Sequence, residues 1–181
     1  MSRLSIPTLD TAPEASKPTL AAVQKQLGVV PNLFRLIGSS AAALTAFTSL
    51  QGALARTLDV KTRERIALAV AQVNGCSYCL AAHTYLALNL AKISPQEIEL
   101  NRKGASGDAK ANAAVAFAAN VARLRGHVSA ADIASVREAG FTDPQIVEIV
   151  ALVAENSFTN YLNEVAKTEI DFPEVDVVEV A

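Results

Sequence analysis

Several residue types are scarce in this chain of 181 residues, and each scarcity narrows what the protein can do. Tryptophan is absent, aromatic residues make up only 5%, and there are just two cysteines and two histidines. Lysine and arginine number 16 against 18 aspartates and glutamates, and no cluster of basic residues is long enough to follow a phosphate backbone. Nucleic acid is therefore not an expected partner.

Long apolar runs are also missing. A helix that spans a bilayer needs roughly 20 apolar residues, and the longest candidates, 66–73 and 146–154, are much shorter. The first 18 residues lack the apolar core of a signal peptide. We therefore expect a soluble cytoplasmic protein with no membrane partner. In a reducing cytoplasm, paired cysteines are more typical of a redox or metal site than of a structural disulfide.

What the sequence does contain is alanine, leucine and valine, which dominate an apolar content of 51%. Because alanine and leucine are strong helix formers, this composition predicts an all-α protein. The length suits one domain with a substantial core. We expect a helical bundle built from helical hairpins. Residues 18–170 form its single domain, between an extended N-terminal arm, 1–17, and an extended C-terminal tail, 171–181.

Capping residues, prolines and stop glycines predict where the helices begin and end. The expected starts lie near Pro18, Pro31, Ser39 or Ser40, Asp59 or Thr62, Cys76, Ser94, Asp108, Ser129 and Asp132, and Thr142 or Asp143. The helix after Ser40 is expected to continue to Leu58. Helix 63–73 is apolar on nearly all sides after Arg65, which indicates a buried helix, and Asn74 and Gly75 break it.

The segment 64–83, ERIALAVAQVNGCSYCLAAH, holds both cysteines and one of the two histidines. Steps of three and four residues place Cys76, Cys79 and His83 on one face of a helix, near its start. A helix N-terminus favours a thiolate, and His83 can exchange a proton with Cys79. Glu64, on the preceding helix, can orient His83 if the chain folds back at Gly75. This arrangement predicts thiol chemistry.

A second thiol gives such a site a way to turn over. A peroxide oxidises a thiolate to a sulfenic acid, and a neighbouring thiol condenses with it to form a disulfide. An external dithiol then restores the pair by exchange. Cys76 and Cys79 are close enough in sequence for this without a large rearrangement.

Other interpretations of these residues stay open. The cysteines could be two small apolar residues on a core helix, and His83 a core histidine. Glu64 could be a surface carboxylate paired with a neighbouring cation. A zinc site would use both cysteines and His83, but its fourth ligand would have to be Glu64 or His127. We interpret His127 as a solvated loop residue without a role.

The spacing from Glu64 through Cys76-Ser77-Tyr78-Cys79 to His83 resembles the signature of the alkylhydroperoxidase D-like, carboxymuconolactone decarboxylase superfamily. The segments VPNLF, 30–34, and NSFTNYLN, 156–163, resemble its peroxidase-related branch. The resemblance covers roughly 20–173. It implies an all-helical domain that assembles into dimers, trimers or hexamers, with peroxidase or disulfide-reductase chemistry.

Carried over by position, the resemblance implies a role for each site residue. Cys79 would be the peroxidatic cysteine and Cys76 the resolving thiol and proton donor, while Glu64 and His83 would form a proton relay. No cofactor is implied, because the electrons would come from a dithiol, a thioredoxin-like protein or a lipoyl group. Tyr78 stands where peroxidase members carry another relay histidine and is a further candidate site residue. A phenol with a pKa of about 10 is a poor base at neutral pH, though it can donate a hydrogen bond.

The leading hypothesis is therefore a thiol-dependent peroxidase or dithiol oxidoreductase that reduces small alkyl hydroperoxides. Two alternatives are a decarboxylase of the lactone-processing kind and a non-catalytic redox sensor or assembly module. Self-association is expected from the apolar composition. The last long helix also carries a polar set that lines either a pocket or an interface: Asn156, Asn160, Tyr161 and Asn163.

Overall fold

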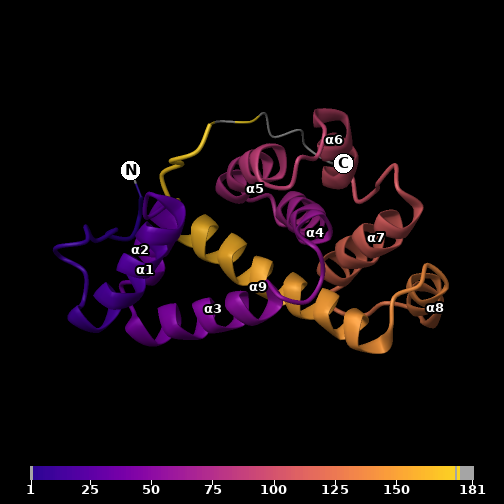
Figure 1. Cartoon of the computed structure of the whole chain (residues 1–181), viewed down its shortest axis with the longest axis horizontal. Helices are drawn as coiled ribbons and strands as arrows, with labels where there is room; N and C mark the ends of the chain where they lie inside the picture. Colours follow the sequence, from indigo (N-terminus) through magenta and orange to yellow (C-terminus); the bar gives the residue numbers. More distant parts are fainter. Residues whose placement is uncertain (1, 174, 176–181) are drawn as a thin grey trace.

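The computed structural model describes residues 2–173 and 175, and every regular element in that part of the chain is helical (Figure 1). The all-α prediction is confirmed. A short 3₁₀ helix, η1 (Glu14–Ser16), precedes the α-helices. These are α1 (Lys17–Leu27), α2 (Asn32–Ile37), α3 (Ala41–Leu54), α4 (Val60–Val73), α5 (Ser77–Asn89), α6 (Pro95–Arg102), α7 (Ala109–Arg123), α8 (Ala130–Glu138) and α9 (Asp143–Ala166).

Helix α4 is the centre of the bundle, as its apolar composition predicts. It packs against α5, α6, α7 and α9 (Figure 1). Residues 66–71 are at most 2% exposed. Ile66, Leu68 and Val70 fill the space between helices, and the alanines between them let neighbouring helices approach closely. None of the helices in the described part of the chain is both long and apolar enough to cross a membrane.

A tight turn joins α4 to α5, and it fixes where α5 begins. Gly75 has a φ of +68°, a backbone conformation that glycine adopts without strain. Its N–H donates to the carbonyl of Gln72, and the N–H of Cys76 donates to the carbonyl of Ala71. These two bonds form the Schellman motif, which ends α4 and reverses the chain. Cys76 therefore becomes the N-cap of α5.

Two local predictions were wrong. Helix α3 ends at Leu54 and does not continue to Leu58. Backbone hydrogen bonds between residues three positions apart tighten the chain there, and the Thr57 hydroxyl donates to the Leu54 carbonyl. The N-terminal arm is not extended throughout. Residues 14–16 form η1, and the buried Ser16 hydroxyl donates to the carbonyl of Gly38.

The segment after α9 runs beside α5 (Figure 1) and forms one wall of the region around the cysteines. Its backbone is tied to α2, since the side-chain amide of Asn32 donates to the carbonyl of Glu169 at 2.9 Å. Ile170 and Phe172 pack against the cluster that holds Cys76 and Cys79. In the predicted extended tail, 171–181, positions 174 and 176–181 lie outside the described residues.

Candidate functional site

Both thiols lie at the N-terminal end of α5 and are free. The backbone N–H of Cys79 donates to the sulfur of Cys76 at 3.3 Å, so Cys76 caps the helix in the way that serine or aspartate usually does. Cys76 is 0% exposed and Cys79 is 2% exposed. The unpaired N–H groups of the first turn favour negative charge on these sulfur atoms.

The structure brings His83 and Glu64 together across the α4–α5 hairpin. Nδ1 of His83 lies 2.8 Å from Oε2 of Glu64, and the two side chains are 22% and 12% exposed. Burial disfavours the charged imidazolium, but the Glu64 carboxylate outweighs burial and raises the pKa of His83. His83 lies one helical turn after Cys79, so a protonated His83 places a positive charge beside this thiol.

The surroundings of the two thiols push their pKa values in opposite directions. A hydrogen bond from Cys76 lowers the pKa of Cys79 against the effect of burial, and the charge of His83 lowers it further. The same bond raises the pKa of Cys76, which burial also raises. Cys79 is thus favoured as the thiolate, while Cys76 keeps its proton. These are the protonation states that a nucleophile and a proton donor require.

Asparagines from α9 complete the surroundings of Cys79. The side-chain amide of Asn163 donates to the sulfur of Cys79 at 3.3 Å, and Asn160 also lowers the pKa of this thiol. Asn160 is held in turn by the amide of Asn74 at 2.9 Å. Asn156, Asn160 and Asn163 are all buried, whereas Tyr161 is exposed. Steps of four and three residues place the asparagines on one face of α9, a spacing visible in the sequence.

Tyr78 lies between the cysteines in sequence but is bonded elsewhere. Its hydroxyl donates to Oδ1 of Asp171 at 2.7 Å and accepts from the backbone N–H of Leu33 at 3.2 Å. Its ring packs edge-on against Phe172. Burial raises the pKa of Tyr78 above its ordinary value, so the phenol stays protonated at neutral pH. Tyr78 therefore fastens α5 to α2 and to the C-terminal segment.

Sequence reasoning missed Glu155, which belongs to the surroundings of His83. Burial raises the pKa of this carboxyl, although the charges of His83 and Arg63 oppose that shift. A hydrogen bond with Gln51 connects it to α3. Glu155 is thus a second acid beside the His83–Glu64 pair. No local spacing relates it to the motif, because α9 comes into contact only through the packing of the bundle.

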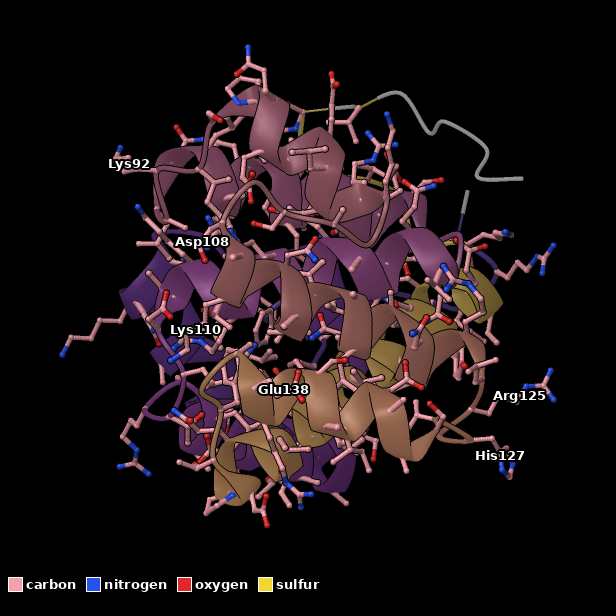
Figure 2. All side chains as sticks on the ribbon, turned by 90° about the vertical axis from the view of Figure 1, so that its right-hand side faces the viewer. Lys92, Asp108, Lys110, Arg125, His127 and Glu138 are labelled. Atoms are coloured by element: carbon pink, nitrogen blue, oxygen red, sulfur yellow. The ribbon has the colours of Figure 1, made fainter. Side chains whose placement is uncertain are left out.

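The alternative of a metal centre gains no support within residues 2–173 and 175. No group of three or more His, Cys, Asp and Glu side chains there is placed to hold a metal ion. His127, the candidate fourth ligand, is exposed in the loop after α7, and Figure 2 shows it at the outer edge of the molecule near Arg125.

Comparison with known proteins gives one family and a consistent fold. Residues 41–123 match the model of the carboxymuconolactone decarboxylase family. The crystal structure of an alkylhydroperoxidase AhpD core, an uncharacterized peroxidase-related protein from Ralstonia eutropha JMP134, is 26% identical with a TM-score of 0.83; the match covers 94% of this chain and 92% of that one. No curated protein matches the sequence.

Two further structures are similar. An uncharacterized peroxidase-related protein from Silicibacter sp. TM1040 is 28% identical with a TM-score of 0.81, covering 93% of this chain and 91% of that one. The debrominase Bmp8, 19% identical with a TM-score of 0.76 over 94% of this chain and 91% of its own, shares the fold. The family match spans Glu64, both cysteines and His83, and together with the two peroxidase-related structures it supports the alkylhydroperoxidase D-like, carboxymuconolactone decarboxylase superfamily for this chain.

Proposed function

We propose that this protein is a thiol-dependent peroxidase that reduces small alkyl hydroperoxides, with Cys79 as the nucleophile. One observation carries the proposal: Cys79 has a lowered pKa and receives hydrogen bonds from Cys76 and Asn163, beside a histidine paired with a carboxylate. A lowered pKa matters because the thiolate is the form that attacks.

The first step oxidises Cys79. Its thiolate attacks the terminal oxygen of the hydroperoxide, the O–O bond breaks, and Cys79 becomes a sulfenic acid. The leaving alkoxide takes the proton of the Cys76 thiol and departs as an alcohol. The hydrogen bond between the two thiols supports this role for Cys76, since it places that proton beside the reacting sulfur.

The second step closes the disulfide. The Cys76 thiolate attacks the sulfur of the Cys79 sulfenic acid, and the displaced hydroxide takes a proton from His83 and leaves as water. An external dithiol then reduces the disulfide by exchange. One of its protons ends on Cys76 and the other on His83, while its own sulfurs become a disulfide. Glu64 favours the charged form of His83 in the reduced protein, so that the proton is available when the disulfide closes, which the raised pKa of His83 supports.

This scheme runs without a basic residue at position 78. The Tyr78 hydroxyl is committed to Asp171 and Leu33, so the proton relay consists of His83 and Glu64. The burial of both sulfurs favours small hydroperoxides. His83 is the more exposed member of its pair, and a substrate that approaches along its ring reaches Cys79 within one helical turn.

The test is peroxide consumption by the reduced protein with excess dithiol. We expect many turnovers per site for the wild type and none for Cys79→Ser. Cys76→Ser should consume about one equivalent and then stop as a sulfenic acid, because no thiol resolves it. Ser77→Ala, a change inside the same motif, is the matched control and should turn over normally.

Other outcomes would redirect the assignment. Normal turnover by Cys79→Ser would overturn the proposal. A wild type that forms a reversible Cys76–Cys79 disulfide but never exceeds one equivalent would instead be a redox sensor. Activity on a carboxylated lactone that survives alkylation of both thiols would identify a decarboxylase.

A further inference from the structure

Two buried amides on α9 each leave one polar atom without a hydrogen-bond partner among the described residues. Asn163 donates from Nδ2 to the sulfur of Cys79 at 3.3 Å, but its Oδ1 has no donor there. Asn160 accepts at Oδ1 from the amide of Asn74 at 2.9 Å, but its Nδ2 has no acceptor in hydrogen-bond geometry within the same part of the chain. Asn163 is 2% exposed and Asn160 is 0% exposed. Such atoms are costly to bury and uncommon, so both call for an explanation.

Both of these atoms belong to groups that act on Cys79. Oδ1 of Asn163 is part of the amide that contacts the sulfur, and the amide of Asn160 is close enough to the same sulfur to favour its thiolate. The two asparagines are three positions apart, so they share one face of α9. The site therefore presents a free acceptor and a free donor next to the atom that reacts.

A hydroperoxide has the groups that this pair lacks. Its terminal oxygen carries one O–H, which donates, and its inner oxygen has lone pairs, which accept. A small polar molecule of this kind satisfies a buried donor and a buried acceptor at once. The burial of Cys76 and Cys79 limits the size of such a molecule. The free atoms thus match the reacting end of a small hydroperoxide.

We propose that Asn163 and Asn160 bind the substrate of the peroxidase reaction proposed above, on which this inference rests. Oδ1 of Asn163 accepts from the terminal O–H of the hydroperoxide, and Nδ2 of Asn160 donates to the inner oxygen. The terminal oxygen is thereby held at the Cys79 thiolate.

The same two contacts serve the chemical step. When the Cys79 sulfur attacks, the O–O bond breaks, the terminal OH stays on sulfur as the sulfenic acid, and the inner oxygen takes the bonding electron pair. Nδ2 of Asn160 then donates to the developing alkoxide, as the donors of an oxyanion hole do. The alkoxide leaves as an alcohol once it has taken the proton of Cys76. Asn160 therefore acts on the leaving oxygen, and Asn163 on the oxygen that is attacked.

The test compares two reactions of the same thiol in the full chain. Oxidation of Cys79 by ethyl hydroperoxide uses both asparagines, whereas alkylation by methyl iodide, which forms no such hydrogen bonds, needs only the thiolate. The readout is the ratio of the two second-order rate constants for the reduced protein, followed at Cys79 by mass spectrometry at one pH. Because both rates scale with the thiolate fraction, the ratio is insensitive to a changed thiol pKa.

Two substitutions of equal size on this helix should behave in opposite ways. Asn160→Asp keeps an oxygen for Asn74 but removes the Nδ2 donor, so the ratio should fall at least about tenfold. Asn163→Asp removes the donor to sulfur but keeps an acceptor for the O–H, so the ratio should stay within about threefold of the wild type. Asn163→Leu also removes the acceptor and should lose about tenfold, which tests the site even if Asn160→Asp does not fold.

Asn156→Ala is the matched control, because its amide donates to the Leu152 carbonyl, and its ratio should equal that of the wild type. Wild-type ratios in both Asn160→Asp and Asn163→Leu would overturn this assignment and leave the peroxidase proposal standing. An equal fall in Asn163→Asp and Asn163→Leu would overturn the role of the Asn163 acceptor. A wild-type ratio no higher than that of free cysteine would overturn the peroxidase proposal itself, and this inference with it.

Discussion

The two faces of α9 depart from a simple amphipathic helix, although its first half still buries Ile146, Ile149 and Leu152 in the core. The inner face buries the amides of Asn156, Asn160 and Asn163, while the outer face exposes valines and aromatic rings. Burying an amide is favourable only if it is hydrogen-bonded. Each inner amide has one such bond, to the Cys79 sulfur, to Asn74 or to the helix backbone, but Oδ1 of Asn163 is buried without a partner among the described residues. Helix α9 thus places buried amides beside the thiol site on one side and exposed apolar side chains on the other.

The first prediction is that a substitution on the inner face of α9 changes the reactivity of the Cys79 thiol. Asn163→Asp replaces a hydrogen-bond donor to Cys79 with a negative charge, so the pKa of Cys79 should rise. Each unit of that rise removes about tenfold of the thiolate at a pH below the pKa. The measurement is the rate of alkylation by iodoacetamide between pH 5 and 9.

The sign of the pH profile follows from the direction of the shift. Because folding lowers the pKa of Cys79, the wild type should stay reactive below the ordinary thiol pKa of about 8.5 and lose reactivity only as the pH falls through the lowered value. Asn156→Ala is the matched control, since that amide donates to the Leu152 carbonyl and not to sulfur. Equal profiles for Asn163→Asp and wild type would show that the α9 amide does not stabilise the thiolate.

The second prediction concerns the pair formed by Glu64 and His83. Glu64→Gln should lower the unfolding free energy by about 2 kcal/mol near pH 6, because it removes a charge-assisted hydrogen bond to His83. The pKa of His83 is raised in the folded state, so this stability is present below the unfolded pKa of about 6.5. It is lost as the pH rises through the folded pKa.

Urea unfolding of both proteins from pH 5 to 9 measures this difference. The gap between wild type and Glu64→Gln should narrow toward alkaline pH. A gap that widens there would contradict a charged His83. His127→Gln changes an exposed histidine and should leave the profile as it is, which controls for the general loss of a titrating group.

The third prediction concerns whether Tyr78 takes part in proton transfer or only holds neighbouring segments together. Tyr78→Phe removes the hydroxyl bonded to Asp171 and Leu33 but keeps the ring against Phe172. We expect a loss of about 1 kcal/mol in unfolding free energy, with alkylation of Cys79 keeping its pH dependence. Tyr85→Phe is the control, because Tyr85 is exposed and its ring also contacts Phe172. A shifted pH profile in Tyr78→Phe would place the phenol in the proton relay.

Sequence periodicity predicted the parts of this site that are close along the chain. Cys76, Cys79 and His83 share a face because they belong to one helix, and Gly75 identified the reversal that returns α5 to Glu64. Periodicity could not predict the contacts between segments that are far apart in the sequence. Asn163 meets Cys79 across 84 positions and Asp171 meets Tyr78 across 93, and these contacts depend on how helices cross. Spacing within one helix carries no information about crossing angles.

The smallest expected effect lies on the outer face of α9. Val147→Thr changes a side chain that is 68% exposed, so the unfolding free energy should stay within about 0.5 kcal/mol of the wild type. Alkylation of Cys79 should be unaffected under the same conditions. Ile149→Thr, two residues further along and 0% exposed, is the counterpart on the buried side and should cost several times more. If the two substitutions were equally costly, the outer face of α9 would be packed as tightly as the inner face, and the contrast between the two faces would fail.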